Sequence, residues 1–184
     1  MGTPRIIDWR SPEGMDKKAA LLLPPGYKQG ERLPVIVRVR PGEHPYARIN
    51  RFGFGLDNME NAQILAAQGY AAYYPGFSAD SRDPMKQFAA AVIPAVNALI
   101  DLGIADPERL GVLGFSYGSY CVLGLITQTD RFKAAVAQAG ITNFSSFYSQ
   151  MPRSWFKEGE GSMSGAMNTS RILPCFILIE YKRR

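Results

Sequence analysis

Cysteine is scarce in this chain of 184 residues, which contains only Cys121 and Cys175. Two thiols give neither a disulfide framework nor a metal-ligand spacing, and their apolar surroundings predict thiols of the core. No run approaches eighteen uninterrupted apolar residues, so the sequence predicts no membrane span. The opening MGTPRIIDWR has no apolar core of a signal peptide, so we expect a cytoplasmic protein, unless the natural start lies upstream.

A concentrated basic surface is also missing. The formal charge is +5, but Lys and Arg are scattered along the chain apart from residues 182–184. Nucleic-acid binding needs a clustered basic face, so we expect no nucleic-acid partner. The glycines at 111, 114 and 118 do not form G-x-G-x-x-G, and no G-K-[ST] follows, which argues against a nucleotide site. The sequence therefore predicts neither a cofactor nor a bound metal.

The composition, 46% hydrophobic, is enough for one domain with a true core. Apolar runs and turn signals predict strands over 19–23, 34–40, 70–74, 109–115 and 133–138, and helices over 58–68, 85–102 and 117–128. Asp-Pro-Glu at 106–108 predicts a turn, and Pro94 predicts a kink in the second helix. Alternation of strands and helices is typical of the α/β class, with a mostly parallel sheet covered by helices on both faces.

One motif carries chemistry, Gly-Phe-Ser-Tyr-Gly at residues 114–118, which matches G-x-S-x-G. A chain of this length holds such a match by chance roughly 6% of the time. Here Ser116 falls where an apolar strand ends and a helix begins, as a nucleophile elbow requires. We expect Gly114 and Gly118 to avoid collisions at that turn, and the backbone amide of Tyr117 to donate to an oxyanion. The alternative is a tight strand–helix turn with an idle serine.

At this point the sequence resembles a known family. The extended segment Gly-Phe-Ser-Tyr-Gly-Ser-Tyr resembles the G-x-S-Y-G-G-Y box of prolyl oligopeptidase (S9) family serine peptidases. Further segments resemble that family at residues 22–27, 50–53, 104–111 and 131–136. The resemblance implies a partial α/β-hydrolase fold and a serine-type peptidase. Such an enzyme would cleave a peptide substrate through an acyl-serine intermediate, with Ser116 as nucleophile.

Several departures from the family are informative. Arg40 stands where the family often has a tyrosine whose hydroxyl serves the oxyanion hole, and Ser119 replaces a glycine. The triad order in this fold is Ser, Asp or Glu, then His, yet no histidine follows Ser116. The one histidine, His44, precedes it and is better interpreted as a solvent-exposed loop residue than as an improvised base. A serine without its base is a poor nucleophile, so we expect this chain to be inactive. The family's β-propeller is absent from the chain.

The end of the chain departs from the family altogether. Likeness persists through residues 155–163 and vanishes after Gly165. Read in a shifted frame, permitted codons of the tail spell YIENSPLLYFDRVQTP, which resembles the family's continuation. We therefore divide the chain into a partial hydrolase domain, 1–165, and a tail, 166–184, produced by a frameshift between Gly165 and Asn168. The last strands of the sheet would then be missing, and the encoding DNA tests this.

Two other functions stay open. One is an esterase or other acyl hydrolase on the same scaffold, because fold alone does not decide the reaction. The other is a catalytically dead hydrolase-like module that binds partners. Neither peptide specificity nor oligomeric state follows from these motifs.

Overall fold

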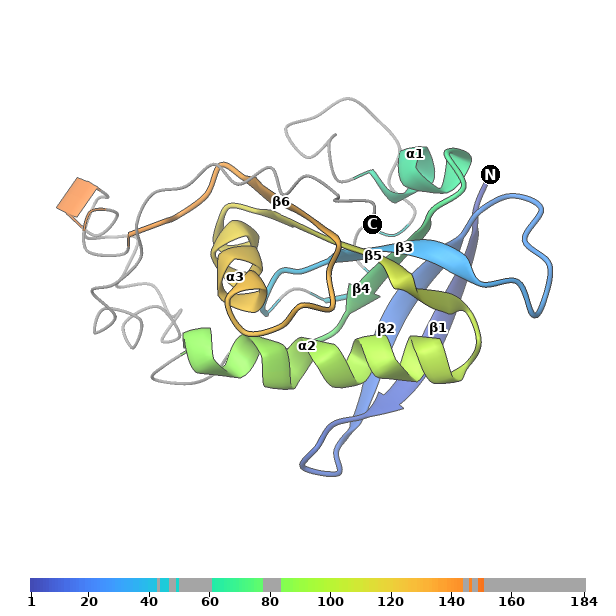
Figure 1. The fold of residues 1–184 in the computed structure, drawn as a ribbon, viewed down its shortest axis with the longest axis horizontal. Helices are drawn as coiled ribbons and strands as arrows, with labels where there is room; N and C mark the ends of the chain where they lie inside the picture. Colours follow the sequence, from blue (N-terminus) through green and yellow to red (C-terminus); the bar gives the residue numbers. More distant parts are fainter. Residues whose placement is uncertain are drawn as a thin grey trace.

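The computed structural model describes residues 1–42, 44–46, 49, 61–77, 84–143, 146 and 149–150. The predicted tail, 166–184, and Cys175 within it lie outside the described residues. The described elements are, in chain order, β1 (Thr3–Arg10), β2 (Asp16–Leu23), β3 (Leu33–Arg38), α1 (Ala62–Ala67), β4 (Ala71–Pro75), α2 (Pro84–Asp101), β5 (Ala105–Phe115), α3 (Tyr117–Ile126) and β6 (Ala134–Gln138) (Figure 1).

The strands form one mixed sheet in the order β1-β2-β4-β3-β5-β6. The β2 strand runs antiparallel to β1 and β4, whereas β3 is parallel to both β4 and β5, and β5 is parallel to β6. Each parallel connection passes through a helix, as parallel neighbours require. The predicted α/β class with a mostly parallel sheet is confirmed.

Helices cover both faces of this sheet. The α2 and α3 helices lie on one face and α1 lies on the other, as Figure 1 shows. The β2 strand illustrates how the sequence builds both layers, because successive strand side chains point to opposite faces. Leu21 and Leu23 join the larger core beneath α2 and α3, while Ala20 and Leu22 join a smaller cluster beneath α1. The continuous apolar run of β2 therefore reflects a strand buried on both sides.

The helices predicted from periodicity occur close to their expected positions. The α1 helix is described from Ala62 and is capped by the Asn61 side chain, which accepts a hydrogen bond from the Gln63 N–H at 3.0 Å. The α2 helix continues through Pro94 to Asp101, and the kink expected at Pro94 stays a prediction. Within the described ranges, no helix is long and apolar enough to cross a membrane.

The turn predicted at residues 106–108 is wrong, because these residues belong to β5. The strand bulges there instead of turning. Leu33 of β3 lies opposite Ala105, but the next paired residue of β3, Val35, lies opposite Leu110. The extra residues of β5 loop out of the ladder, as a bulge allows without ending the strand. The Asp-Pro signal therefore marks an irregularity inside a longer strand.

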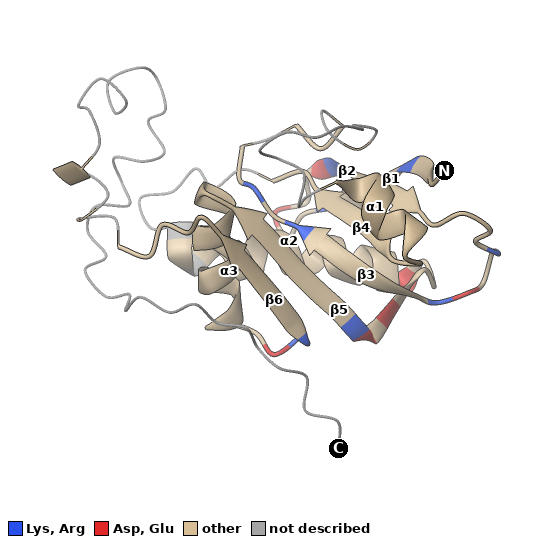
Figure 2. Ribbon diagram, turned by 90° about the horizontal axis from the view of Figure 1, so that it is seen from above, with Lys and Arg blue, Asp and Glu red and all other residues tan. Residues whose placement is uncertain are grey.

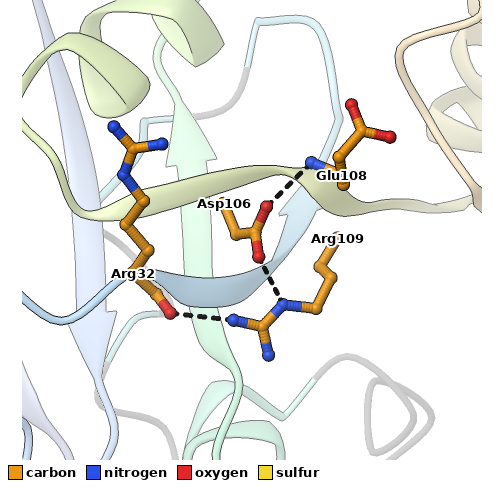
Figure 3. A network of polar contacts seen from close by, with 4 residues as sticks. All are labelled: Arg32, Asp106, Glu108 and Arg109. Carbon is orange, nitrogen blue, oxygen red and sulfur yellow. Dashed lines mark hydrogen bonds and ion pairs between the residues drawn. The ribbon is translucent and has the colours of Figure 1, made fainter.

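A polar network at Asp106 accompanies this bulge (Figure 3). The Asp106 carboxylate accepts hydrogen bonds from the Glu108 backbone N–H at 2.9 Å and from Arg109 Nε at 2.6 Å. Arg109 also donates to the carbonyl oxygen of Arg32 at 2.9 Å, which ties the start of β5 to the segment before β3. The hydrogen bond from Arg109, followed by that from the Glu108 backbone, lowers the pKa of Asp106.

Candidate active site

Ser116 occupies the turn between the end of β5 and the start of α3, where it is partly exposed. Its backbone has φ 55° and ψ −115°. Residues with a side chain rarely adopt positive φ, and such a conformation costs on the order of 1–3 kcal/mol. Strain of this kind persists only where the surrounding structure imposes it, and it is typical of a nucleophile held on a sharp strand-to-helix turn.

Two glycines allow the neighbouring backbones to approach this turn. A Cβ atom on Gly114 would lie 2.3 Å from the carbonyl oxygen of Gly118. A Cβ atom on Gly118 would in turn lie 2.3 Å from the carbonyl oxygen of Val39, the residue that follows β3. Both separations are far shorter than any real carbon–oxygen contact, and the obstructing atoms are backbone atoms. Both positions of the motif therefore require glycine because β5, α3 and β3 meet there.

Hydrogen bonds fix the turn to the adjacent strand β6. The Ser116 N–H donates to the Gln138 carbonyl at 2.9 Å, and the Ser119 N–H donates to the Ser116 carbonyl at 3.0 Å. The Ser119 hydroxyl lies 2.9 Å from the Gly114 carbonyl oxygen and also within hydrogen-bonding distance of the Gln138 carbonyl oxygen. Ser119 is fully buried, so its hydroxyl joins both sides of the turn in the core.

The sequence alone predicts no role for Ser119 in this turn beyond the replacement of a glycine of the family. Ser119 is the one serine or threonine in α3, one turn after Ser116, and this is the signal that could have revealed it. A buried hydroxyl needs a partner, and the carbonyls within reach are those of Gly114 in β5 and Gln138 in β6.

Two other residues singled out in the sequence, His44 and Cys121, make no described contact with Ser116. His44 is exposed, and its ring packs against Tyr46 with 5.1 Å between ring centroids. No hydrogen bond from a described residue joins Ser116 to a histidine or a carboxylate. Cys121 is fully buried in the core, and burial raises the pKa of its thiol, which makes it a packing residue rather than a nucleophile.

Elsewhere in the described part of the chain, neither metal-ligating nor basic side chains gather into a site. Among the described residues, no group of three His, Cys, Asp or Glu side chains could hold a metal ion. Figure 2 shows the Lys and Arg residues of the described part spread over several elements rather than gathered on one face. The turn thus combines a strained serine, two closely packed glycines and the N-terminus of a helix. This arrangement is compatible with attack of the serine on a carbonyl, because the helix N-terminus stabilises the negative charge that develops on the carbonyl oxygen.

Comparison with known proteins agrees with this geometry. A sequence profile of the prolyl oligopeptidase family matches residues 81–171. The chain is 29% identical over 157 residues to the uncharacterized peptidase YuxL of Bacillus subtilis, an alignment covering 79% of the chain and 23% of that relative. This chain thus spans less than a quarter of the length of that curated relative.

Solved structures give the same result. A puromycin-hydrolyzing peptidase of Mycobacterium tuberculosis superposes with a TM-score of 0.63 at 30% identity, covering 82% of this chain and 24% of its own. The acylaminoacyl peptidase of Pyrococcus horikoshii superposes with a TM-score of 0.63 at 26% identity, covering 88% of this chain and 28% of its own. The chain belongs to the prolyl oligopeptidase family, and its sheet is part of the α/β-hydrolase catalytic domain of that family.

Proposed function

We propose that this chain carries the nucleophile of a serine peptidase, and that Ser116 attacks the carbonyl carbon of a peptide bond. A bond forms between Ser116 Oγ and that carbon, the carbonyl oxygen takes up an electron pair, and the amine then leaves with a proton. Water releases the acyl group in a second step. The observation that carries this proposal is the strained φ of Ser116 at a strand-to-helix turn whose glycines tolerate no side chain.

The same proposal assigns Tyr117 to the oxyanion hole. Tyr117 is the first residue of α3, and the backbone N–H groups of the first turn point out of a helix end. Because Tyr117 directly follows Ser116, its amide lies close to the carbonyl oxygen of an acyl group bonded to that serine. A donor of this kind acts mainly when charge develops in the transition state.

We further propose that this chain alone turns over peptides poorly. Ser116 needs a base to accept its proton, and the amine needs an acid to supply one. The residues described around Ser116 supply neither. Loss of the triad partners leaves a residual acceleration of about 10³–10⁴-fold from binding and the oxyanion hole. Slow acylation of Ser116 without efficient peptide turnover is the expected behaviour.

The test is covalent labelling with a fluorophosphonate probe, read by intact mass and peptide mapping, with Ser116→Ala as the control. We expect one adduct, located on Ser116 and absent from the variant. An adduct that persists in Ser116→Ala, or a stable monodisperse chain that is never labelled, would refute the role of Ser116 and favour a non-catalytic module. Parallel assays with a chromogenic peptide and a short acyl ester then separate a peptidase from an esterase.

A further inference from the structure

The segment that follows β3 lies beside the proposed nucleophile. The carbonyl oxygen of Val39 and the Cα of Arg40 lie 2.3 Å and 3.8 Å from the point where Gly118 would carry a Cβ. Gly118 is in the first turn of α3, two residues after Ser116. In α/β-hydrolases a backbone N–H from the loop after this strand can complete the oxyanion hole. The tyrosine hydroxyl that often serves it in the prolyl oligopeptidase family is replaced here by Arg40. The direction of each amide in this segment therefore matters.

The amide directions follow from one hydrogen bond and one proline. The N–H of Val39 donates to the carbonyl of Leu113 in β5, at 2.9 Å, so it points toward β5. Arg40 precedes Pro41, and a residue before proline is held in an extended conformation. Amides of an extended chain point alternately to its two sides, so Arg40 directs its N–H away from β5. Position 41 would again face β5, whose end carries the nucleophile.

That position has no amide proton, because Pro41 lacks a backbone N–H. The following amide is already used, since the Gly42 N–H donates to the Phe77 carbonyl at 3.0 Å. Of the four residues from Val39 to Gly42, the first and last are committed to other carbonyls, the second faces away, and the third has no proton. This stretch therefore presents no main-chain donor to the acyl oxygen.

We propose that Pro41 removes the second main-chain donor from the oxyanion hole, leaving the Tyr117 amide as the main-chain donor at this turn, and that the chain consequently prefers aryl esters to amides. This inference rests on the proposed role of Ser116. When Ser116 Oγ bonds to the carbonyl carbon of an aryl ester, its hydroxyl proton passes to water, and the tetrahedral centre collapses by breaking the carbon–oxygen bond to a phenolate. A phenolate leaves without a proton, whereas an amine must first be protonated. Weak oxyanion stabilisation and a missing acid therefore penalise amides most.

The inference predicts that replacing one proline increases reactivity. Pro41→Ala and Pro41→Gly both restore an N–H at a position directed toward β5. We expect either variant to react faster with a fluorophosphonate probe and with p-nitrophenyl acetate, by about 10²-fold, because a single oxyanion donor is worth about 10²–10³ in rate. Pro45→Ala is the matched control, since it removes a neighbouring proline outside this stretch, and its rate should equal that of the unaltered chain.

Each other outcome has a definite meaning. A rate that is unchanged in both Pro41 variants, while Ser116 is labelled, overturns the inference and leaves the proposed function intact. An increase in Pro41→Gly without one in Pro41→Ala attributes the effect to chain flexibility and also overturns it. A tenfold loss in Arg40→Met would identify the guanidinium as the second donor, again against the inference. Failure of Ser116 to react in every folded variant refutes the proposed function itself, and circular dichroism verifies folding.

Discussion

The strained backbone of Ser116 predicts that glycine at this position makes the protein more stable than alanine does. Both Ser116→Gly and Ser116→Ala remove the hydroxyl, so their difference isolates the Cβ atom. At φ 55° and ψ −115°, a residue with a Cβ loses about 1–3 kcal/mol to strain that glycine avoids. Glycine has a greater entropic cost of ordering, about 0.5–1 kcal/mol relative to alanine. Subtracting the midpoints of these ranges, about 2 and about 0.75 kcal/mol, the free energy of unfolding of Ser116→Gly should exceed that of Ser116→Ala by about 1 kcal/mol.

Thermal and urea unfolding of the two variants measure this difference. For a chain of this size, 1 kcal/mol corresponds to about 2–4 °C in melting temperature, so the glycine variant should melt several degrees higher. Ala139, which has φ 50° just after β6, offers a reference outside the proposed chemistry, and Ala139→Gly should also stabilise. A melting temperature of Ser116→Gly equal to or below that of Ser116→Ala would show that the surroundings do not strain this residue.

Two further perturbations test the packing and the charge described above. Gly118→Ala should destabilise the fold by about 1–3 kcal/mol, the usual cost of overpacking, because the new Cβ would collide with the Val39 carbonyl. A melting temperature equal to that of the unaltered chain would contradict this close approach. Asp106→Asn removes a carboxylate whose pKa is lowered by the hydrogen bond from Arg109. The stability that this carboxylate contributes is therefore present above a pH of about 4 and is lost as the pH falls through the pKa of Asp106 in the folded protein. The stability gap between the two proteins, below about 1 kcal/mol for so exposed a pair, should close toward pH 2, and a gap independent of pH would refute the assignment.

The sequence predicted the turn at residues 114–118 because several signals coincide there, namely an apolar strand, two glycines and the start of an apolar helix. It failed at residues 106–108, where Asp and Pro usually end a strand. The Arg109 side chain satisfies that Asp within the strand and also donates to the carbonyl oxygen of Arg32, which is distant in the sequence. Local pattern reasoning does not detect such a long-range contact. Ser119 and Pro41 were missed for a related reason, since their effects depend on which carbonyl or face a neighbouring element presents.

The hydrogen bond from the Ser116 N–H to the Gln138 carbonyl couples the proposed nucleophile to β6, the last strand in the described part of the sheet. Edge elements of a sheet open locally more readily than its centre, and amide exchange follows the free energy of that opening. Exchange of the Ser116 amide with deuterium should therefore follow that of β6 rather than that of the central strands. A change that stabilises or destabilises β6 would then alter the fraction of time that Ser116 spends in its strained backbone conformation, without any substitution at Ser116 itself.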